Sequence, residues 1–113
     1  MELKADIICT LSLTAQLRGD PKFEILRNNL EWLQIDIFSL YLVHLDFENP
    51  DNYQGILLDE KQAHDFQLSP DDFSLESIGE SSLQKDPILS SAQLIIKDPQ
   101  TREALERSIS ALL

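Results

Sequence analysis

Two histidines, each close to a carboxylate, have the spacing nearest to that of a chemical site. His44 and Asp46 are two residues apart, so in a strand they share a face. Glu60 and His64 are four residues apart, one turn in a helix. Each pair supplies two ligands, whereas a catalytic zinc site takes three from the protein and a structural site takes four. The sequence therefore predicts no metal, and both histidines are interpreted as structural or solvated.

Other signatures of catalysis are also missing from the sequence. The single cysteine, Cys9, lies in an alternating apolar stretch and is expected to be a small buried side chain. Gly19, Gly55 and Gly79 are isolated, so no glycine-rich loop is predicted to hold a phosphate. We accordingly predict no catalytic residue and no cofactor.

Charge is the most pronounced property of the chain. The net charge is −11, and residues 46–80 contain ten acids and one base. Such a field repels nucleic acid and anionic membrane surfaces, and it attracts a basic protein. The alternative is an acidic surface that serves only to keep the protein in solution.

The acidic segment is therefore the predicted surface for a partner protein with a basic surface. Its expected contacts are complementary charges and an apolar anchor, Phe66 or Phe73, since charge steers encounter while buried aromatics hold a complex. The predicted charged contacts are Asp59, Glu60, Asp65, Asp71 and Asp72. Trp32 is interpreted as covering the rim of the core; an exposed anchor for a partner is the alternative.

Two hydrophobic periods meet between Asp20 and Phe47. Asp20 and Pro21 are typical of a helix start, and Leu26, Leu30 and Leu33 then share one face. From Ile35 to Phe47 the period becomes two, with apolar residues on both faces, which is typical of a central strand. A single helix continuing to Phe47 is the competing interpretation.

The flanking segments complete a predicted α/β or α+β domain of residues 1–113. Residues 6–17 alternate, which predicts a first strand and hence an N-terminal βαβ unit. Residues 55–87 are predicted to be an acidic, partly irregular insertion with a short helix at 59–66. Residues 88–97 are expected to form a strand or hairpin, and Asp98 with Pro99 begins a final helix. The expected sheet is mixed, with three to four strands.

This order resembles a thioredoxin-like fold, in which βαβ is joined to ββα. The run LVHLDFENPDNYQG is similar to the second strand and following turn of that superfamily, and Asp86-Pro87-Ile88 stands where the family has its cis-proline. The Cys-x-x-Cys motif is replaced by TAQLRGD, so the resemblance implies no redox chemistry. It implies an adaptor similar to the circadian-clock KaiB-like proteins, which act by binding other proteins.

The functional hypothesis is a non-catalytic interaction module, an adaptor or regulatory protein, expected in the cytoplasm because no signal-peptide pattern is present. An acidic inhibitor, immunity protein or secretion chaperone for a basic partner is the alternative within this class. A small enzyme or ligand-binding domain with a site near His44 and Asp46 is the alternative of another class. The sequence does not specify the oligomeric state.

Overall fold

The fold is a four-stranded antiparallel sheet whose strands are consecutive in the chain, with helices before and after them. The computed structural model describes residues 4–49 and 51–112, including side chains except those of residues 4–9, 80, 83 and 88. The elements follow in the order α1 (Lys4–Gly19), η1 (Pro21–Phe23), α2 (Glu24–Trp32), η2 (Ile37–Ser39), β1 (Tyr41–Asn49), β2 (Asn52–Leu58), β3 (Ala63–Ser69), β4 (Asp72–Ile78), α3 (Glu80–Lys85), α4 (Pro87–Lys97) and α5 (Pro99–Leu112).

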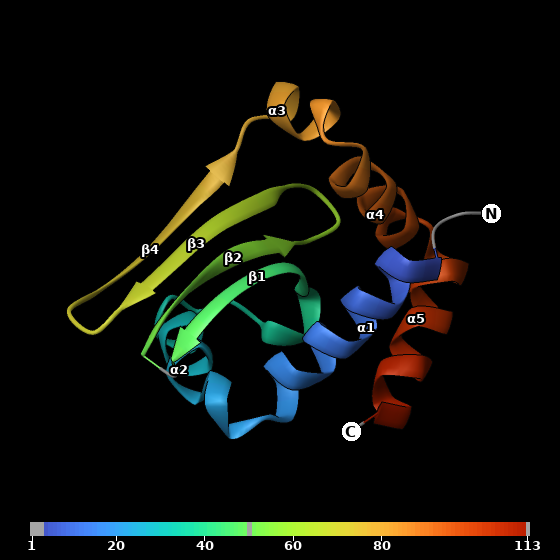
Figure 1. The fold of residues 1–113 in the computed structure, drawn as a ribbon. Helices are drawn as coiled ribbons and strands as arrows, with labels where there is room; N and C mark the ends of the chain where they lie inside the picture. The colour runs from blue at the N-terminus through green and yellow to red at the C-terminus, as the bar shows by residue number, and fades with distance from the viewer. Residues whose placement is uncertain (1–3, 50, 113) are drawn as a thin grey trace.

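The strands form a simple meander in the order β1-β2-β3-β4. Figure 1 shows α1 beside β1, with α4 and α5 beyond it, whereas β4 lies at the opposite edge of the sheet. The β2–β3 and β3–β4 registers run without interruption, but β1 has irregularities between Leu42 and His44 and between Phe47 and Asn49. The two edges of the sheet therefore differ in both regularity and cover.

Two apolar cores lie on the two faces of the sheet. On one face, Leu26 and Leu30 of α2 pack with Leu42, Leu57 and Phe66 of the strands. On the other face, strand residues join the C-terminal helices in a cluster of Ala15, Tyr41, Leu58, Ala63, Leu89, Ile96, Leu105 and Ile109. Because strand side chains alternate between faces, one meander supplies both cores.

Aspartates mark the helix starts that the sequence predicted. The Lys22 N–H donates to Asp20 Oδ1 at 2.9 Å, and Pro21 begins a 3₁₀ turn that leads into α2. Asp98 precedes Pro99 of α5 in the same way, and its carboxylate accepts the N–H of Thr101 at 3.4 Å. The predicted helices after Asp20 and after Asp98 are confirmed, as is a strand ending near Phe47, although β1 begins only at Tyr41.

The predicted first strand at residues 6–17 is wrong, because this segment lies within α1. Its apolar residues alternate, but the buried positions Thr10, Thr14 and Leu17 recur at helical spacing. The alternating pattern would place Thr14 on the polar face of a strand. In the structure Thr14 is buried, and its hydroxyl oxygen accepts the Leu42 N–H at 3.0 Å. The βαβ unit and the mixed sheet are therefore also wrong, and the described strands are all antiparallel. The expected burial of Cys9 lies outside the described side chains.

The irregular insertion predicted at residues 55–87 is also wrong, since it contains most of β2 and all of β3 and β4. The acidic and polar residues on the open face of these strands make the segment look irregular in sequence. Its apolar residues nevertheless alternate, as Phe66 and Leu68 in β3 and as Phe73 and Leu75 in β4. The predicted helix at 59–66 is also wrong, because residues 59–62 form the turn between β2 and β3 and residues 63–66 begin β3. In the turn, Asp59 Oδ1 accepts the N–H groups of Lys61 and Gln62, both at 2.7 Å.

The strand or hairpin predicted at residues 88–97 is part of α4. Pro87 stands at the start of this helix, and the Leu89 N–H donates to Asp86 Oδ1 at 3.2 Å. Leu89, Gln93 and Ile96 are buried at intervals of four and three, so the helical period decides the structure. The described residues contain no cis peptide bond.

Candidate partner-binding groove

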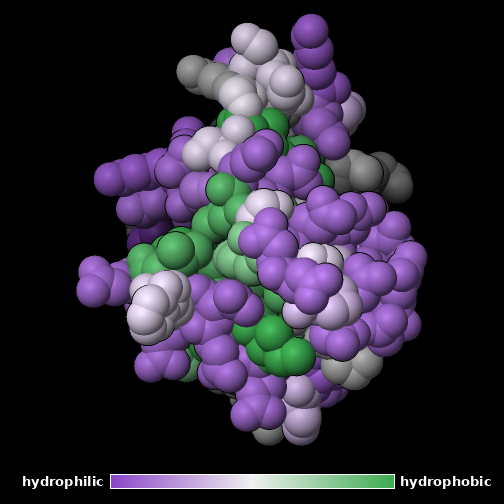
Figure 2. Space-filling view, turned by 90° about the vertical axis from the view of Figure 1, so that its left-hand side faces the viewer, coloured by the Kyte–Doolittle hydropathy of each residue, from purple (hydrophilic) through white to green (hydrophobic). Residues whose placement is uncertain are grey.

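A groove between α2 and β4 gathers apolar and acidic side chains at the surface. We call it the α2–β4 groove; its volume is about 590 Å³, and it is lined by Ile25, Asn29, Trp32, Leu33, Leu68, Ser69, Pro70, Asp71, Asp72, Phe73 and Leu75. Figure 2 looks at the side of the molecule where β4 lies and shows apolar side chains gathered in a band between hydrophilic flanks. This surface has the mixed character of a protein-binding site.

The α2 wall of the groove carries large apolar side chains that remain exposed. Leu26 and Leu30 are buried in the core, whereas Ile25, Trp32 and Leu33 have exposed fractions of 40%, 85% and 49%. Trp32 is therefore exposed and does not cover the rim of the core, whereas its role as an anchor for a partner stays a prediction. Exposed tryptophan is uncommon, and tryptophan is among the residues that contribute most to binding energy.

The β4 wall lies beyond the edge of the helical layer. Phe73 and Leu75 point to the same face of the sheet as Leu68 and Phe66, against which they are paired across the strands. Unlike these β3 neighbours, which are buried, Phe73 and Leu75 remain partly exposed. The apolar face of the sheet thus extends further than α2 covers it.

Two aspartates supply the charge of the groove. Asp71 in the β3–β4 turn and Asp72 at the start of β4 are exposed, and the residues that line the groove include no basic side chain. Asp72 Oδ1 accepts the Phe73 N–H at 2.8 Å, which fixes this carboxylate beside the apolar wall. An apolar segment with basic neighbours complements this arrangement.

The structure brings together only three of the seven predicted contacts, Asp71, Asp72 and Phe73. Phe66 is 2% exposed and belongs to the core, so it is not available to a partner. Asp65 lies on the opposite face of β3, directly across from Glu76 of β4. Ile25 was not among the predicted contacts, although its position outside the Leu26 and Leu30 face was a usable signal. Leu33 was assigned to that buried face, but α2 ends at Trp32 and Leu33 is 49% exposed.

Asp59 and Glu60, the remaining predicted contacts, line a separate cavity of about 450 Å³ together with Tyr41, Arg102 and Glu106. Arg102 Nη1 lies 2.9 Å from Glu60 Oε2. His64 Nε2 lies 3.2 Å from Asp59 Oδ2. Burial by itself raises the pKa of Asp59, but the N–H groups of Gln62 and Lys61 and the His64 ring together hold that pKa below its ordinary value. These carboxylates are thus already paired within the fold.

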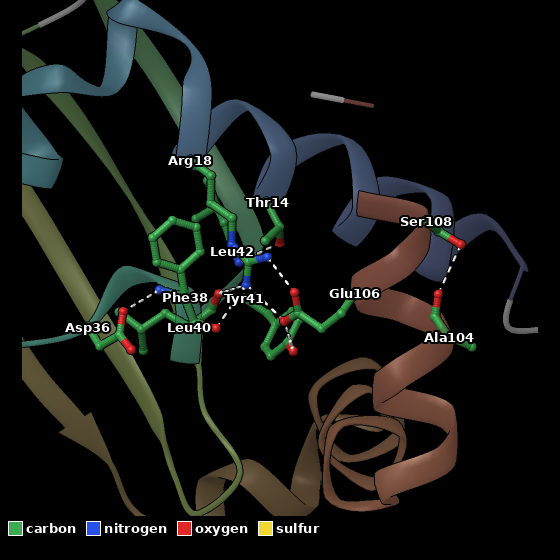
Figure 3. Close-up of polar contacts among 10 residues, drawn as sticks. All are labelled: Thr14, Arg18, Asp36, Phe38, Leu40, Tyr41, Leu42, Ala104, Glu106 and Ser108. Carbon is green, nitrogen blue, oxygen red and sulfur yellow. Dashed lines mark hydrogen bonds and ion pairs between the residues drawn. The ribbon is translucent and has the colours of Figure 1, made fainter. Parts of the chain in front are cut away.

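Beside this cavity, Arg18 joins α1, β1 and α5 (Figure 3). Its side chain is 2% exposed, and its Nη1 and Nη2 atoms lie 2.7 Å and 3.0 Å from the two carboxylate oxygens of Glu106. The Tyr41 hydroxyl also donates to Glu106, and the guanidinium lies over the Phe38 and Tyr41 rings. The bond from Arg18 lowers the pKa of Glu106 despite partial burial. We interpret this cluster as a structural clamp, because both terminal nitrogens of Arg18 donate to protein acceptors, whereas its buried Nε has no hydrogen-bond partner among the described residues.

His44 and Asp46 are both exposed on β1 and line neither the groove nor the cavity. Asp46 Oδ2 accepts a hydrogen bond from the Gln54 amide at 3.4 Å. Among the described residues, no group of three or more histidine, cysteine or acidic side chains is placed to hold a metal ion.

Comparison of the chain with protein-family models, with curated proteins and with solved structures gives no significant match. The resemblance to thioredoxin-like adaptors therefore stays a prediction, and the strand–helix–strand unit on which it depended is absent from the described residues. Within the same residues, no helix is long and apolar enough to cross a membrane.

Proposed function

We propose that this protein is a non-catalytic interaction module, an adaptor or regulatory protein that binds a basic partner through the α2–β4 groove. The observation that carries this proposal is Trp32, 85% exposed on one wall of an apolar groove with acidic residues at its end. A tryptophan in this setting is a typical anchor for a partner, because most of its apolar surface becomes buried on binding.

Apolar and charged residues have separate parts in this proposal. Trp32, Leu33 and Phe73 supply the apolar area that holds the complex, while Asp71 and Asp72 steer a basic partner toward the groove. The net charge of −11 extends this attraction over the surface and weakens association with other acidic molecules.

Salt dependence separates the two forms of this function. An adaptor held by the apolar walls keeps its partner at high salt, because screening acts on exposed charges and leaves apolar burial intact. An acidic inhibitor, immunity protein or secretion chaperone depends more on charge and releases its basic partner. Because the groove has more apolar than charged lining residues, we favour the adaptor.

The test is affinity capture from the native cell extract with three immobilised proteins: the wild type, Trp32→Ala and Leu94→Ala. Leu94 is a matched control because it is 69% exposed on α4, outside the groove. We expect the wild type and Leu94→Ala to retain the same partner and Trp32→Ala to lose it. Retention that is equal on all three proteins, or no retained partner, would contradict the proposal.

A further inference from the structure

The two edges of the sheet are protected to different degrees. At β1, the backbone is interrupted by two register shifts, and α1 lies alongside the strand. The outward N–H of Leu42 donates to Thr14 of α1, so part of this edge is already satisfied. Bulges and covering helices are usual means by which proteins prevent the addition of another strand.

The β4 edge has none of these protections. It is seven residues long, and all seven pair with β3 in one uninterrupted register. Its sequence, DFSLESI, contains neither proline nor lysine, which commonly block strand addition at an edge. Figure 1 shows no helix on the outer side of this strand. β4 is therefore open to pairing.

The turn before β4 determines which of its backbone groups point outward. Ser69 and Asp72 pair across a two-residue turn, and the Ser69 hydroxyl donates to the Asp72 carbonyl at 3.2 Å. In a hairpin of this length the closing pair is hydrogen-bonded, so the alternate residues 73, 75 and 77 direct their N–H and C=O groups away from β3. The Phe73 N–H is bound by Asp72, which leaves Leu75 and Ser77 as the outward donors.

A fifth strand beside β4 would have two different faces. On the α2 side, its side chains would lie over the exposed parts of Ile25, Trp32 and Leu33 in the groove. On the open side, they would lie next to Glu76, which is directly opposite Asp65. Two like charges in this position destabilise a sheet, and a basic neighbour relieves the repulsion.

We propose that the β4 edge accepts an extended segment of the partner as a fifth strand, with apolar side chains toward α2 alternating with basic side chains toward Asp65 and Glu76. This inference rests on the proposed function and specifies how the groove is used. A second copy of this chain is a poorer occupant, because its own β4 carries the acids Asp72 and Glu76 and no base, so it cannot relieve the repulsion at Glu76 in a protein of charge −11.

Two synthetic peptides test the proposal, each about nine residues long, the length of a typical strand, and each composed of valine and lysine only. In the first peptide the two residues alternate; in the second the same residues follow helical spacing. Binding is measured by calorimetry to the wild type, Ser77→Pro and Ser77→Ala. Proline removes an outward N–H that an edge strand can spare, whereas alanine removes only the hydroxyl that donates to Gln62.

We expect the alternating peptide to bind the wild type and Ser77→Ala with equal affinity. It should bind Ser77→Pro with an affinity lower by up to about tenfold, because a backbone hydrogen bond is lost. Hydrogen exchange on the wild type is a second measurement that needs no substitution. The Leu75 and Ser77 amides should become protected in the complex, while those of Ser74 and Glu76, directed at β3, serve as internal controls.

Tighter binding of the helical peptide, or unchanged exchange at Leu75 and Ser77, would overturn strand addition but leave the proposed function standing. Dimers of this chain that Ser77→Pro disrupts would also overturn it, in favour of self-pairing. Failure of both peptides to bind would overturn the inference, and the capture experiment with Trp32→Ala decides the proposed function separately.

Discussion

Trp32 on α2 and Phe73 on β4 lie on opposite walls of one groove, although a complete hairpin meander separates them in the chain. Trp32 is 85% exposed, whereas Phe73 packs against the edge of the core and is partly exposed in the groove. The groove exists because the sheet continues past the last turn of α2. This relationship is the basis of the functional account.

Leu33→Ala should weaken partner binding by about 1 kcal/mol or more, since Leu33 loses apolar contact area in the groove. Its effect on folding should be no more than about 1 kcal/mol, because the side chain is 49% exposed and loses only part of its buried apolar area. Leu94→Ala, the same substitution outside the groove, should change neither quantity. Calorimetry with the captured partner and urea unfolding measure the two effects. Equal losses of binding in both variants would show that the groove is not the contact surface.

Neutralising the groove should act mainly on association. Asp71→Asn combined with Asp72→Asn should lower the association rate and flatten its dependence on salt, while the amide at position 72 can still accept the Phe73 N–H. Asp51→Asn combined with Glu103→Gln makes the same change in net charge at exposed positions elsewhere. Stopped-flow measurements at several salt concentrations compare the two double variants. An identical salt dependence of their association rates would show that Asp71 and Asp72 act only through the net charge of the protein.

Glu106→Gln should destabilise the fold by about 1.5–3 kcal/mol at neutral pH, because Arg18 is buried and loses a charged acceptor. The pKa of Glu106 is lowered in the folded protein, so ionisation favours folding. Its contribution is therefore complete above the ordinary value of 4.5 and is lost as the pH falls below it. Urea unfolding from pH 7 to pH 3 should show that the free energy of unfolding falls less for Glu106→Gln than for the wild type. Glu103→Gln, exposed on the same helix, should retain the full acid loss.

The two tyrosines should not ionise at their ordinary pH while the protein remains folded. Burial raises the pKa of Tyr41 and of Tyr53 to about 12, with the bond to Glu106 adding to the effect at Tyr41. Because the neutral forms are favoured by folding, this stability is lost as the pH rises from 10 to about 12. Tyrosinate absorbance should therefore stay low at pH 10.5 in the native protein but not in urea, where the tyrosines titrate at about 10. Ordinary titration in the native protein would show that these rings are not enclosed.

Gly55→Ala should destabilise the sheet by about 2–3 kcal/mol. A Cβ atom there would lie 2.1 Å from the His44 carbonyl oxygen and 3.0 Å from Phe66 Cε1, and neither the backbone nor the buried ring can move away freely. Gly79→Ala is the matched control, because a Cβ atom at Gly79 meets nothing within 4 Å. Thermal unfolding compares the two variants, and a similar melting temperature for both would argue against the register of β1 and β2.

Local signals in the sequence predict the elements whose ends are marked chemically. Asp20 with Pro21 and Asp98 with Pro99 correctly indicate helix starts, since the carboxylate caps free N–H groups and proline has none to lose. The same signal is present at Asp86 and Pro87. The apolar residues that follow, however, are frequent enough to fit both the period of a strand and the period of a helix. There, burial at Leu89, Gln93 and Ile96 decides for the helix, and burial is a tertiary property.

Long-range packing accounts for the remaining failures. Alternation at residues 6–17 suggested a strand, but α1 is helical because Thr14 and Leu17 pack on β1, which no local pattern reveals. The candidate site was predicted in part for a similar reason. Asp71, Asp72 and Phe73 are adjacent in sequence, whereas their joining with Trp32 requires β4 to lie beside α2.

The fluorescence of Trp32 reports directly on partner binding in the α2–β4 groove, because Trp32 is the only tryptophan in the chain and lines this groove. The measurement is the emission maximum and its quenching by acrylamide, before and after addition of a captured partner that contains no tryptophan. We expect a water-exposed spectrum in the free protein, then a shift to shorter wavelength and protection from quenching in the complex. A stable complex in which both properties of Trp32 are unchanged would contradict partner binding in the groove.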